Sequence, residues 1–137
     1  MKYSPHGELH FEIEKHLLII EKTGPFNLES MIQAEEDVSK IQKGLYKSRW
    51  CVLVIIHGQP IHTPDAAKLL IEGIKNDRRN GRIASALVIT DSENPIINRH
   101  HISEIYMSSG ENFEFFSDIN TAKKWLNDQL EIYHETP

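Results

Sequence analysis

Apolar and polar residues alternate strictly near the start of the chain. In the segment ELHFEIE (8–14), every second residue is apolar and the residues between are acids or histidine. A period of two predicts a strand with one solvated face. The apolar segment LLIIEKT (17–23) follows after only Lys15 and His16, so we expect it to pair with the first strand as an antiparallel hairpin.

Three later runs predict further strands. WCVLVII (50–56) is continuously apolar and rich in β-branched residues, which is typical of a strand buried on both faces at the centre of a parallel sheet. RIASALVIT (82–90) is mostly apolar and predicts the next strand, and the short aromatic run FEFF (113–116) predicts the last.

Apolar residues at helical spacing fill the intervals between these strands. Each helical segment begins with a residue that caps helices or with a proline suited to the first turn. The four predicted starts are Asn27, Thr63-Pro64, Asn94-Pro95 and either Ser117 or Asp118.

The predicted order is therefore β-β-α-β-α-β-α-β-α. Strands alternating with helices imply right-handed crossovers and helices on both faces of a sheet. Because the chain starts with a hairpin, we predict an α/β fold with a mixed five-stranded sheet. The 137 residues contain no repeat, low-complexity tract or linker, so 1–137 is expected to form a single domain.

This pattern resembles the STAS fold of anti-sigma-factor antagonists, and more closely the SpoIIAA-like group of small bacterial proteins. The resemblance rests on the hairpin, on WCVLVII, on HTPDAAKLL and on the ending FEFFSDINTAKKWL. It implies a non-enzymatic binding or regulatory domain. It also implies a small hydrophobic or lipid-like ligand between the helices and the sheet, near the helices that start at Thr63 and Pro95.

The resemblance departs at the position of a regulatory phosphorylation site. The antagonists carry a phosphorylatable serine before the helix that follows the third strand, but the matching segment PIHTPDA (60–66) has no serine. Thr63 is the only hydroxyl there, and Asp65 could act as a fixed negative charge. We interpret Thr63 as a helix cap, which explains its type and place, with phosphorylation of Thr63 as the alternative.

Candidate binding residues gather in the connection HGQPIHT (57–63). Ligands in open α/β sheets favour the carboxyl ends of strands, where this connection and the loop after Thr90 lie. Histidines and a hydroxyl there could orient a mainly apolar ligand, an aromatic at the mouth of the first helix could line its groove, and an acid nearby could pair with a histidine. The predicted ligand-binding residues are Phe26, His57, His62, Thr63 and Asp65.

Composition excludes several other classes. A net charge of −5 argues against nucleic-acid binding. Eight histidines invite a metal hypothesis, but no two lie four apart on a predicted helix and no cysteine pair assists them, so we expect no metal site. No glycine-rich phosphate loop is present, and we expect no cofactor.

The lone cysteine, Cys51, lies in an apolar run and is expected to be buried and inert. It excludes an intramolecular disulfide, which favours a reducing compartment. The first residues show no secretory signal, and the longest apolar run, 50–56, is too short to cross a membrane. We therefore expect a cytoplasmic protein without stable membrane insertion.

Two alternatives to the ligand-binding hypothesis stay open. One is a STAS-type protein-interaction module that antagonises a regulator, with 57–66 as its docking surface. The other is a small hydrolase that depends on His57 or His62, although no nucleophile motif accompanies them. The base rate for small proteins favours a homodimer, but no heptad or apolar edge decides the oligomeric state.

Overall fold

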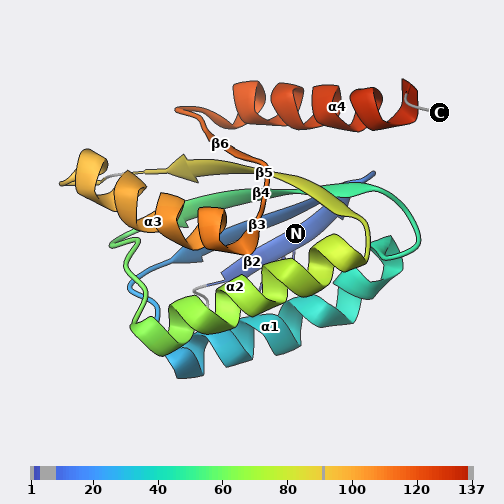
Figure 1. Cartoon of the computed structure of the whole chain (residues 1–137). Coiled ribbons are helices and arrows are strands. Elements are labelled where there is room, and N and C mark those ends of the chain that lie inside the picture. Colours follow the sequence, from blue (N-terminus) through green and yellow to red (C-terminus); the bar gives the residue numbers. More distant parts are fainter. Residues whose placement is uncertain (1, 4–8, 91, 136–137) are drawn as a thin grey trace.

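Residues 2–3, 9–90 and 92–135 are described by the structure, a computed structural model, which includes the side chains of 9–90 and 92–132. Figure 1 shows a single sheet with helices on both faces. The strands are β1 (Lys2–Tyr3), β2 (Leu9–Glu14), β3 (Leu17–Thr23), β4 (Trp50–His57), β5 (Arg82–Ile89) and β6 (Phe113–Phe115). The helices are α1 (Leu28–Gln42), a 3₁₀ turn η1 (Lys43–Leu45), α2 (Pro64–Arg79), α3 (Pro95–Ser109) and α4 (Ile119–Glu135).

The strands lie in the sheet in the same order as in the chain, from β1 to β6. β2 runs antiparallel to both of its neighbours, β1 and β3, whereas β3 to β6 run parallel to one another. Lys15 adopts a φ of 56° in the two-residue hairpin loop, in which Glu14 pairs with Leu17. The predicted mixed α/β fold is confirmed, and the structure adds β1, whose two residues are too few to show a periodic pattern.

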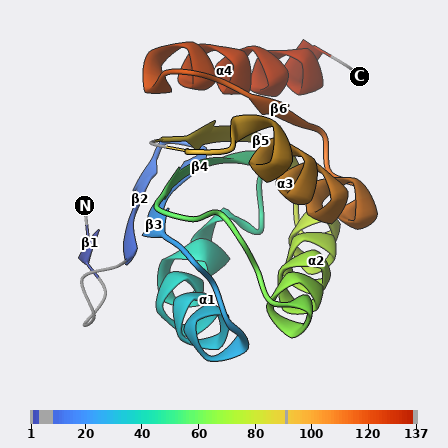
Figure 2. The same ribbon diagram turned by 90° about the vertical axis from the view of Figure 1, so that its left-hand side faces the viewer.

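Three helices cover one face of the sheet and one covers the other. In Figures 1 and 2, α1, α2 and α3 lie below the sheet and α4 lies above it. The larger apolar core lies under α1, α2 and α3 and includes Leu18, Val52 and Ile102. The core beneath α4 contains small residues such as Ala84 and Ala86, which let this helix approach the sheet closely.

The predicted central strand is buried along most of its length. Residues 50–56 are all buried, as the continuous apolar run indicates. Trp50 is fully enclosed, and its indole Nε1 donates to the carbonyl of Asn80 at 2.9 Å. Cys51 is fully buried as predicted, and burial raises the pKa of its thiol to about 12, so the sulfur is an inert core group.

Candidate ligand-binding cleft

The loop after β3 and the loop after β4 meet at the carboxyl ends of these two strands. Phe26 and His62 form a parallel bridge, in which the Phe26 N–H donates to Ile61 and the Thr63 N–H donates to Phe26. Gly24 permits this approach, because a Cβ there would lie 1.8 Å from the carbonyl oxygen of Gln59. The loops therefore pack on each other and close the space between them.

His62 is buried by this packing. Its ring lies 4.7 Å from the Phe26 ring and 5.7 Å from the His101 ring, between centroids. The side chain is 4% exposed, and neither ring nitrogen has a hydrogen-bond partner. Burial, then the charges of Lys22 and His101, lower the pKa of His62 to about 3, so the imidazole is neutral at pH 7.

His57 belongs to a separate cluster at the same edge of the sheet. Its Nε2 lies 2.6 Å from a carboxylate oxygen of Glu21, and its Nδ1 lies 2.5 Å from the hydroxyl of Thr90. The Thr90 hydroxyl also lies 3.3 Å from the carbonyl of Ile56. The carboxylate beside His57 is thus Glu21, whereas the sequence analysis considered Asp65 for that role.

Thr63 and Asp65 both serve the start of α2. The Thr63 hydroxyl donates to the Asp65 carboxylate at 2.6 Å and accepts from the Ala66 N–H at 3.4 Å. The same carboxylate accepts from Ala66 N–H at 2.9 Å, and these bonds lower the pKa of Asp65. The prediction that Thr63 caps the helix is confirmed.

A shallow hollow of about 220 Å³ lies where the sequence analysis expected a groove. It separates the loop after β4 from the start of α3. Its lining consists of Gly58, Gln59, Ile61, Glu93, Asn94 and Asn98. None of the five predicted ligand-binding residues is in this lining, which is more polar than an apolar ligand requires.

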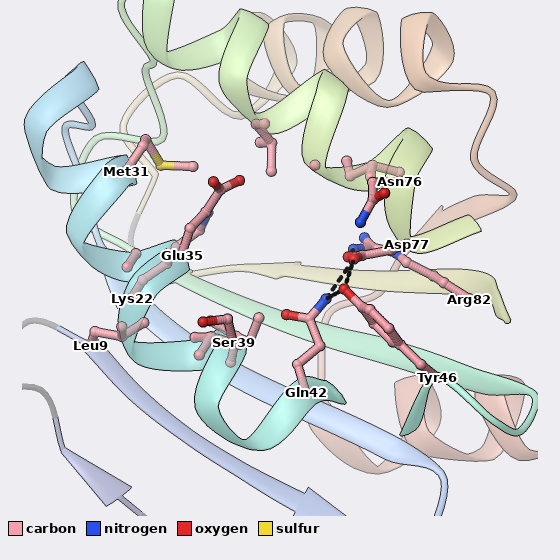
Figure 3. Close-up of a pocket in the computed structure, with 16 residues that line it drawn as sticks. Leu9, Lys22, Met31, Glu35, Ser39, Gln42, Tyr46, Asn76, Asp77 and Arg82 are labelled. Carbon is pink, nitrogen blue, oxygen red and sulfur yellow. Dashed lines mark hydrogen bonds and ion pairs between the residues drawn. The ribbon is translucent and has the colours of Figure 1, made fainter. Parts of the chain in front are cut away.

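An opening with a more apolar lining lies between α1 and α2, on the face of the sheet that these helices cover. This α1–α2 cleft has a volume of about 220 Å³ (Figure 3). Its apolar lining comes from both helices and from β2 and β3, and comprises Leu9, Ile20, Met31, Ala34, Val38, Leu70 and Ile74. Its polar lining comprises Lys22, Glu35, Ser39, Gln42, Tyr46, Asn76, Asp77 and Arg82. The cleft thus combines an apolar body with polar groups, as small-molecule sites do.

A second hollow, of about 280 Å³, lies on the other side of α1, and we call it the α1 side hollow. It reaches the predicted residue Phe26 and the first turns of the helix. It shares four lining residues with the α1–α2 cleft, so the two hollows adjoin: Leu9, Lys22, Met31 and Ala34. Each alone is below the range of about 300–1,000 Å³ typical of ligand sites, but the two adjoining hollows together reach it.

Lys22 lies at the boundary of the two hollows. Its ammonium lies 4.6 Å from the centroid of the Phe26 ring, over the ring face. Among the described residues, no carboxylate lies within ion-pair distance of it. Burial and, second, the positive charge of Arg82 lower the pKa of Lys22 to about 8.

Two acids of α1, Glu35 and Asp37, line the two hollows, one in each. Glu35 extends toward α2 in Figure 3, where Gly73 makes room: a Cβ on Gly73 would lie 2.7 Å from the Glu35 carboxylate. Partial burial and the charge of Asp77 raise the pKa of Glu35. On the other side of α1, Asp37 accepts from the Gln33 amide at 3.1 Å, while its second oxygen is enclosed without a partner.

The far end of the α1–α2 cleft rests on a buried ionic network. The carboxylate of Glu111 accepts from Arg78 and from Arg82, each at 2.5 Å, and from the Ser85 hydroxyl at 2.7 Å. Arg82 also contacts Asp77 at 3.1 Å. Burial alone would raise the pKa of Glu111, but the arginines hold it below its usual value, so the group stays ionised.

The network extends to the cleft wall through Asp77. That carboxylate accepts from the Gln42 amide at 2.6 Å and from the Tyr46 hydroxyl at 3.1 Å, as the dashed lines in Figure 3 show. Burial and Asp77 raise the pKa of Tyr46 to about 12. Hydrogen bonds therefore hold the side chains at this end of the cleft in place.

The structure packs the Phe26 and His62 rings together, joins Thr63 to Asp65 at the start of α2, and places His57 in another cluster. Sequence analysis missed Lys22, although a signal existed. In a hairpin with two loop residues, Lys22 pairs with Leu9, and Leu9 was assigned to the buried face. The register therefore places Lys22 on the buried face as well.

The described part of the chain contains neither a metal-binding cluster nor a membrane-spanning helix. No group of three or more histidine, cysteine, aspartate or glutamate side chains in that part of the chain could hold a metal ion. His6 and His134, considered for such a site, lie outside the residues whose side chains are described. No helix in the described part is long and apolar enough to cross a membrane.

Comparison with known proteins identifies the fold. No protein-family model matches the chain, and no curated protein matches it in sequence. A solved structure is similar to it: an uncharacterised DUF3478-family protein with a SpoIIAA-like fold from Shewanella loihica PV-4, with a TM-score of 0.58 and 18% identity. The similarity covers 86% of this chain and 91% of the other. The chain therefore has a SpoIIAA-like fold, as its sequence pattern predicts.

Proposed function

We propose that the protein is a non-enzymatic, cytoplasmic binding domain that holds a small ligand with an apolar body in the α1–α2 cleft. The observation that carries this proposal is the cleft itself, which two helices and the sheet enclose without filling. Apolar groups line it, and polar groups stand at its ends. The SpoIIAA-like resemblance, which implies a ligand between helices and sheet, supports the same conclusion.

Native mass spectrometry of the purified protein tests the proposal. We expect a non-covalent adduct of a few hundred daltons that organic solvent releases. Ala34, half-buried on α1, lines both hollows, so Ala34→Phe should fill the space and remove the adduct. Glu36→Phe, at an exposed position of the same helix, should retain it. An adduct that persists in Ala34→Phe would place the ligand elsewhere.

A second candidate is a protein-interaction module, as in the STAS antagonists. It is supported by apolar side chains exposed near the carboxyl edge of the sheet. Ile61 is 48% exposed in the predicted docking loop, and Ile96 and Ile97 in the first turn of α3 are 84% and 67% exposed. A stoichiometric partner that wild type retains and Ile96→Asp loses would favour this function over ligand binding.

A third candidate is a hydrolase. Glu21, His57 and Thr90 form a chain of carboxylate, imidazole and hydroxyl, the residue types that hydrolases combine for nucleophilic attack. None of the three lines the hollows described above, which is why we place this candidate last. Ester turnover that His57→Ala abolishes would overturn the non-enzymatic proposal.

A further inference from the structure

Lys22 carries a positive charge that the described residues leave without a counter-charge. Its side chain is half-buried beneath α1 and lines both hollows. The other cation in the α1–α2 cleft, Arg82, is paired with Glu111 and Asp77. Lys22 therefore is the basic group of the cleft that a ligand can engage without breaking an ion pair.

We propose that Lys22 binds the acidic group of an amphipathic monocarboxylate whose hydrocarbon chain lies in the α1–α2 cleft. This inference rests on the proposed function and adds the chemical class of the ligand. A carboxylate at Lys22 would form a charge-assisted hydrogen bond, which is stronger than a neutral one. From that point an apolar chain would pass along Leu9, Met31 and Val38, which line the cleft beside it.

The electrostatic surroundings of Lys22 favour an anionic partner. Taking an ammonium out of water is unfavourable unless an opposite charge compensates for it. Burial and the repulsion of Arg82 both act against the charge of Lys22, and the Phe26 ring offers only a weak attraction. A bound carboxylate would supply the missing compensation.

The same surroundings favour a single negative charge over two. Glu35 lines the α1–α2 cleft, and Glu29 and Asp37 line the α1 side hollow. A phosphate monoester, with up to two negative charges at neutral pH, would meet more repulsion from these acids than a carboxylate would. The unpartnered oxygen of Asp37 is enclosed by protein atoms, so it does not offer a matching site for a cationic ligand.

The inference can be tested with four ligands that share one hydrocarbon chain: octanoate, octanol, octyl phosphate and octylamine. Isothermal titration calorimetry on the full chain at pH 7 gives their dissociation constants. We expect octanoate to bind about ten- to a hundredfold more tightly than octanol, the range for a hydrogen bond to a charged group. Octyl phosphate and octylamine should bind more weakly than octanoate.

Two matched variants test whether the ammonium of Lys22 binds the carboxylate. Lys22→Met keeps the hydrocarbon stem and removes the ammonium, so octanoate should lose its advantage while octanol binds as before. Lys68→Met makes the same change at an exposed position of α2 outside both hollows and should leave all four affinities unchanged. If Lys22→Met does not fold, the ligand series on wild type still decides the question.

The outcomes separate the two proposals. Equal affinity for octanoate and octanol, or unchanged octanoate binding in Lys22→Met, would overturn the role of Lys22 while leaving an apolar cleft. If octyl phosphate or octylamine bound more tightly than octanoate, the proposal that the ligand is a monocarboxylate would be wrong. Failure of all four ligands to bind would count against the proposed function and against this inference together.

Discussion

Arg82 and Lys22 are both cations that the fold removes from water, but their surroundings differ. Arg82 lies at the start of β5 and donates three hydrogen bonds, one each to Glu111, Asp77 and Ser85. Lys22 lies near the end of β3, and the described residues offer its ammonium only the face of an aromatic ring. The two side chains line the same cleft, one at each end of its polar lining.

The difference separates a part of the cleft that ion pairs hold in place from a part whose cation has no ion pair among the described residues. A buried network with every charge compensated holds β5, α2 and the end of α3 in fixed positions. Around Lys22, the neighbouring polar groups are incompletely paired, including His62 and Asp37. Unpaired buried groups are destabilising, so this part of the molecule is less completely compensated than the network around Arg82.

The largest expected effect comes from breaking the compensated network. Glu111→Ala leaves the buried Arg82 without its main counter-charge and should lower the free energy of unfolding by about 3–5 kcal/mol. Urea denaturation followed by circular dichroism measures the change. Glu114→Ala, at an exposed position of β6, should change it by no more than about 0.5 kcal/mol. If the two variants changed the free energy of unfolding by similar amounts, the network around Arg82 would not have the importance inferred for it.

His62 should make the protein sensitive to acid. Its pKa is about 3 in the fold against 6.5 when unfolded, so between these values the unfolded chain takes up the proton first. Stability is therefore greatest above pH 6.5 and should fall by roughly 1.4 kcal/mol for each pH unit below it. Urea midpoints between pH 7 and pH 4.5 give this slope.

The contribution of His62 is isolated by difference. His62→Leu should lose this part of the slope, whereas other acid-sensitive groups act equally in both proteins. The exposed His100 pairs with Glu104 on the surface of α3, so His100→Leu should keep the wild-type slope. A wild-type slope in His62→Leu would mean that the buried ring accepts its proton without cost.

Lys22→Met should raise the free energy of unfolding, whereas Glu111→Ala should lower it. Removing an uncompensated charge should stabilise the protein at pH 7 by about 1–2 kcal/mol, less than the full pKa shift implies because the group is only half-buried. The gain should fade as the pH rises from 8 toward 10.5, since wild-type Lys22 loses its proton there before the unfolded chain does. A loss of stability at pH 7 would show that Lys22 is structurally compensated.

The smallest contrast concerns the starts of two helices. Thr63 caps α2 through its hydroxyl, whereas Asn94 precedes α3 without a side-chain capping bond. Thr63→Ala should therefore cost about 1 kcal/mol and Asn94→Ala only a few tenths, as thermal unfolding of the two variants would show. The reverse order would mean that Asn94 stabilises α3 by another contact.

Local patterns were sufficient to predict the fold. The continuous apolar run of 50–56, the hairpin of two loop residues and the cap at Thr63 each depend on neighbours in the chain, and all three appear in the structure. The two residues of β1 carry no pattern and were missed. The fold class followed because strands and helices of these lengths can pack in few ways.

The cleft was harder to predict because it depends on pairs of residues distant in sequence. The rule that ligands favour the carboxyl ends of strands directed attention to 57–63, but the approach of Phe26 to His62 closes that space. Glu111 follows a helix end and looks like an ordinary loop acid until Arg78 and Arg82 reach it. Only the register of Lys22 with Leu9 could have been inferred from the hairpin.

The position of α4 means that one face of the sheet stays uncovered until this helix has been synthesised. This last helix is the one described element that covers its face of the sheet, through Ala122, Leu126 and Leu130 (Figure 1). When a nascent chain has been synthesised as far as β6, all the described strands are present, but the face of the sheet that α4 covers is still exposed to water as a continuous apolar surface. During synthesis, that surface is an aggregation hazard until the seventeen residues of α4 dock on it.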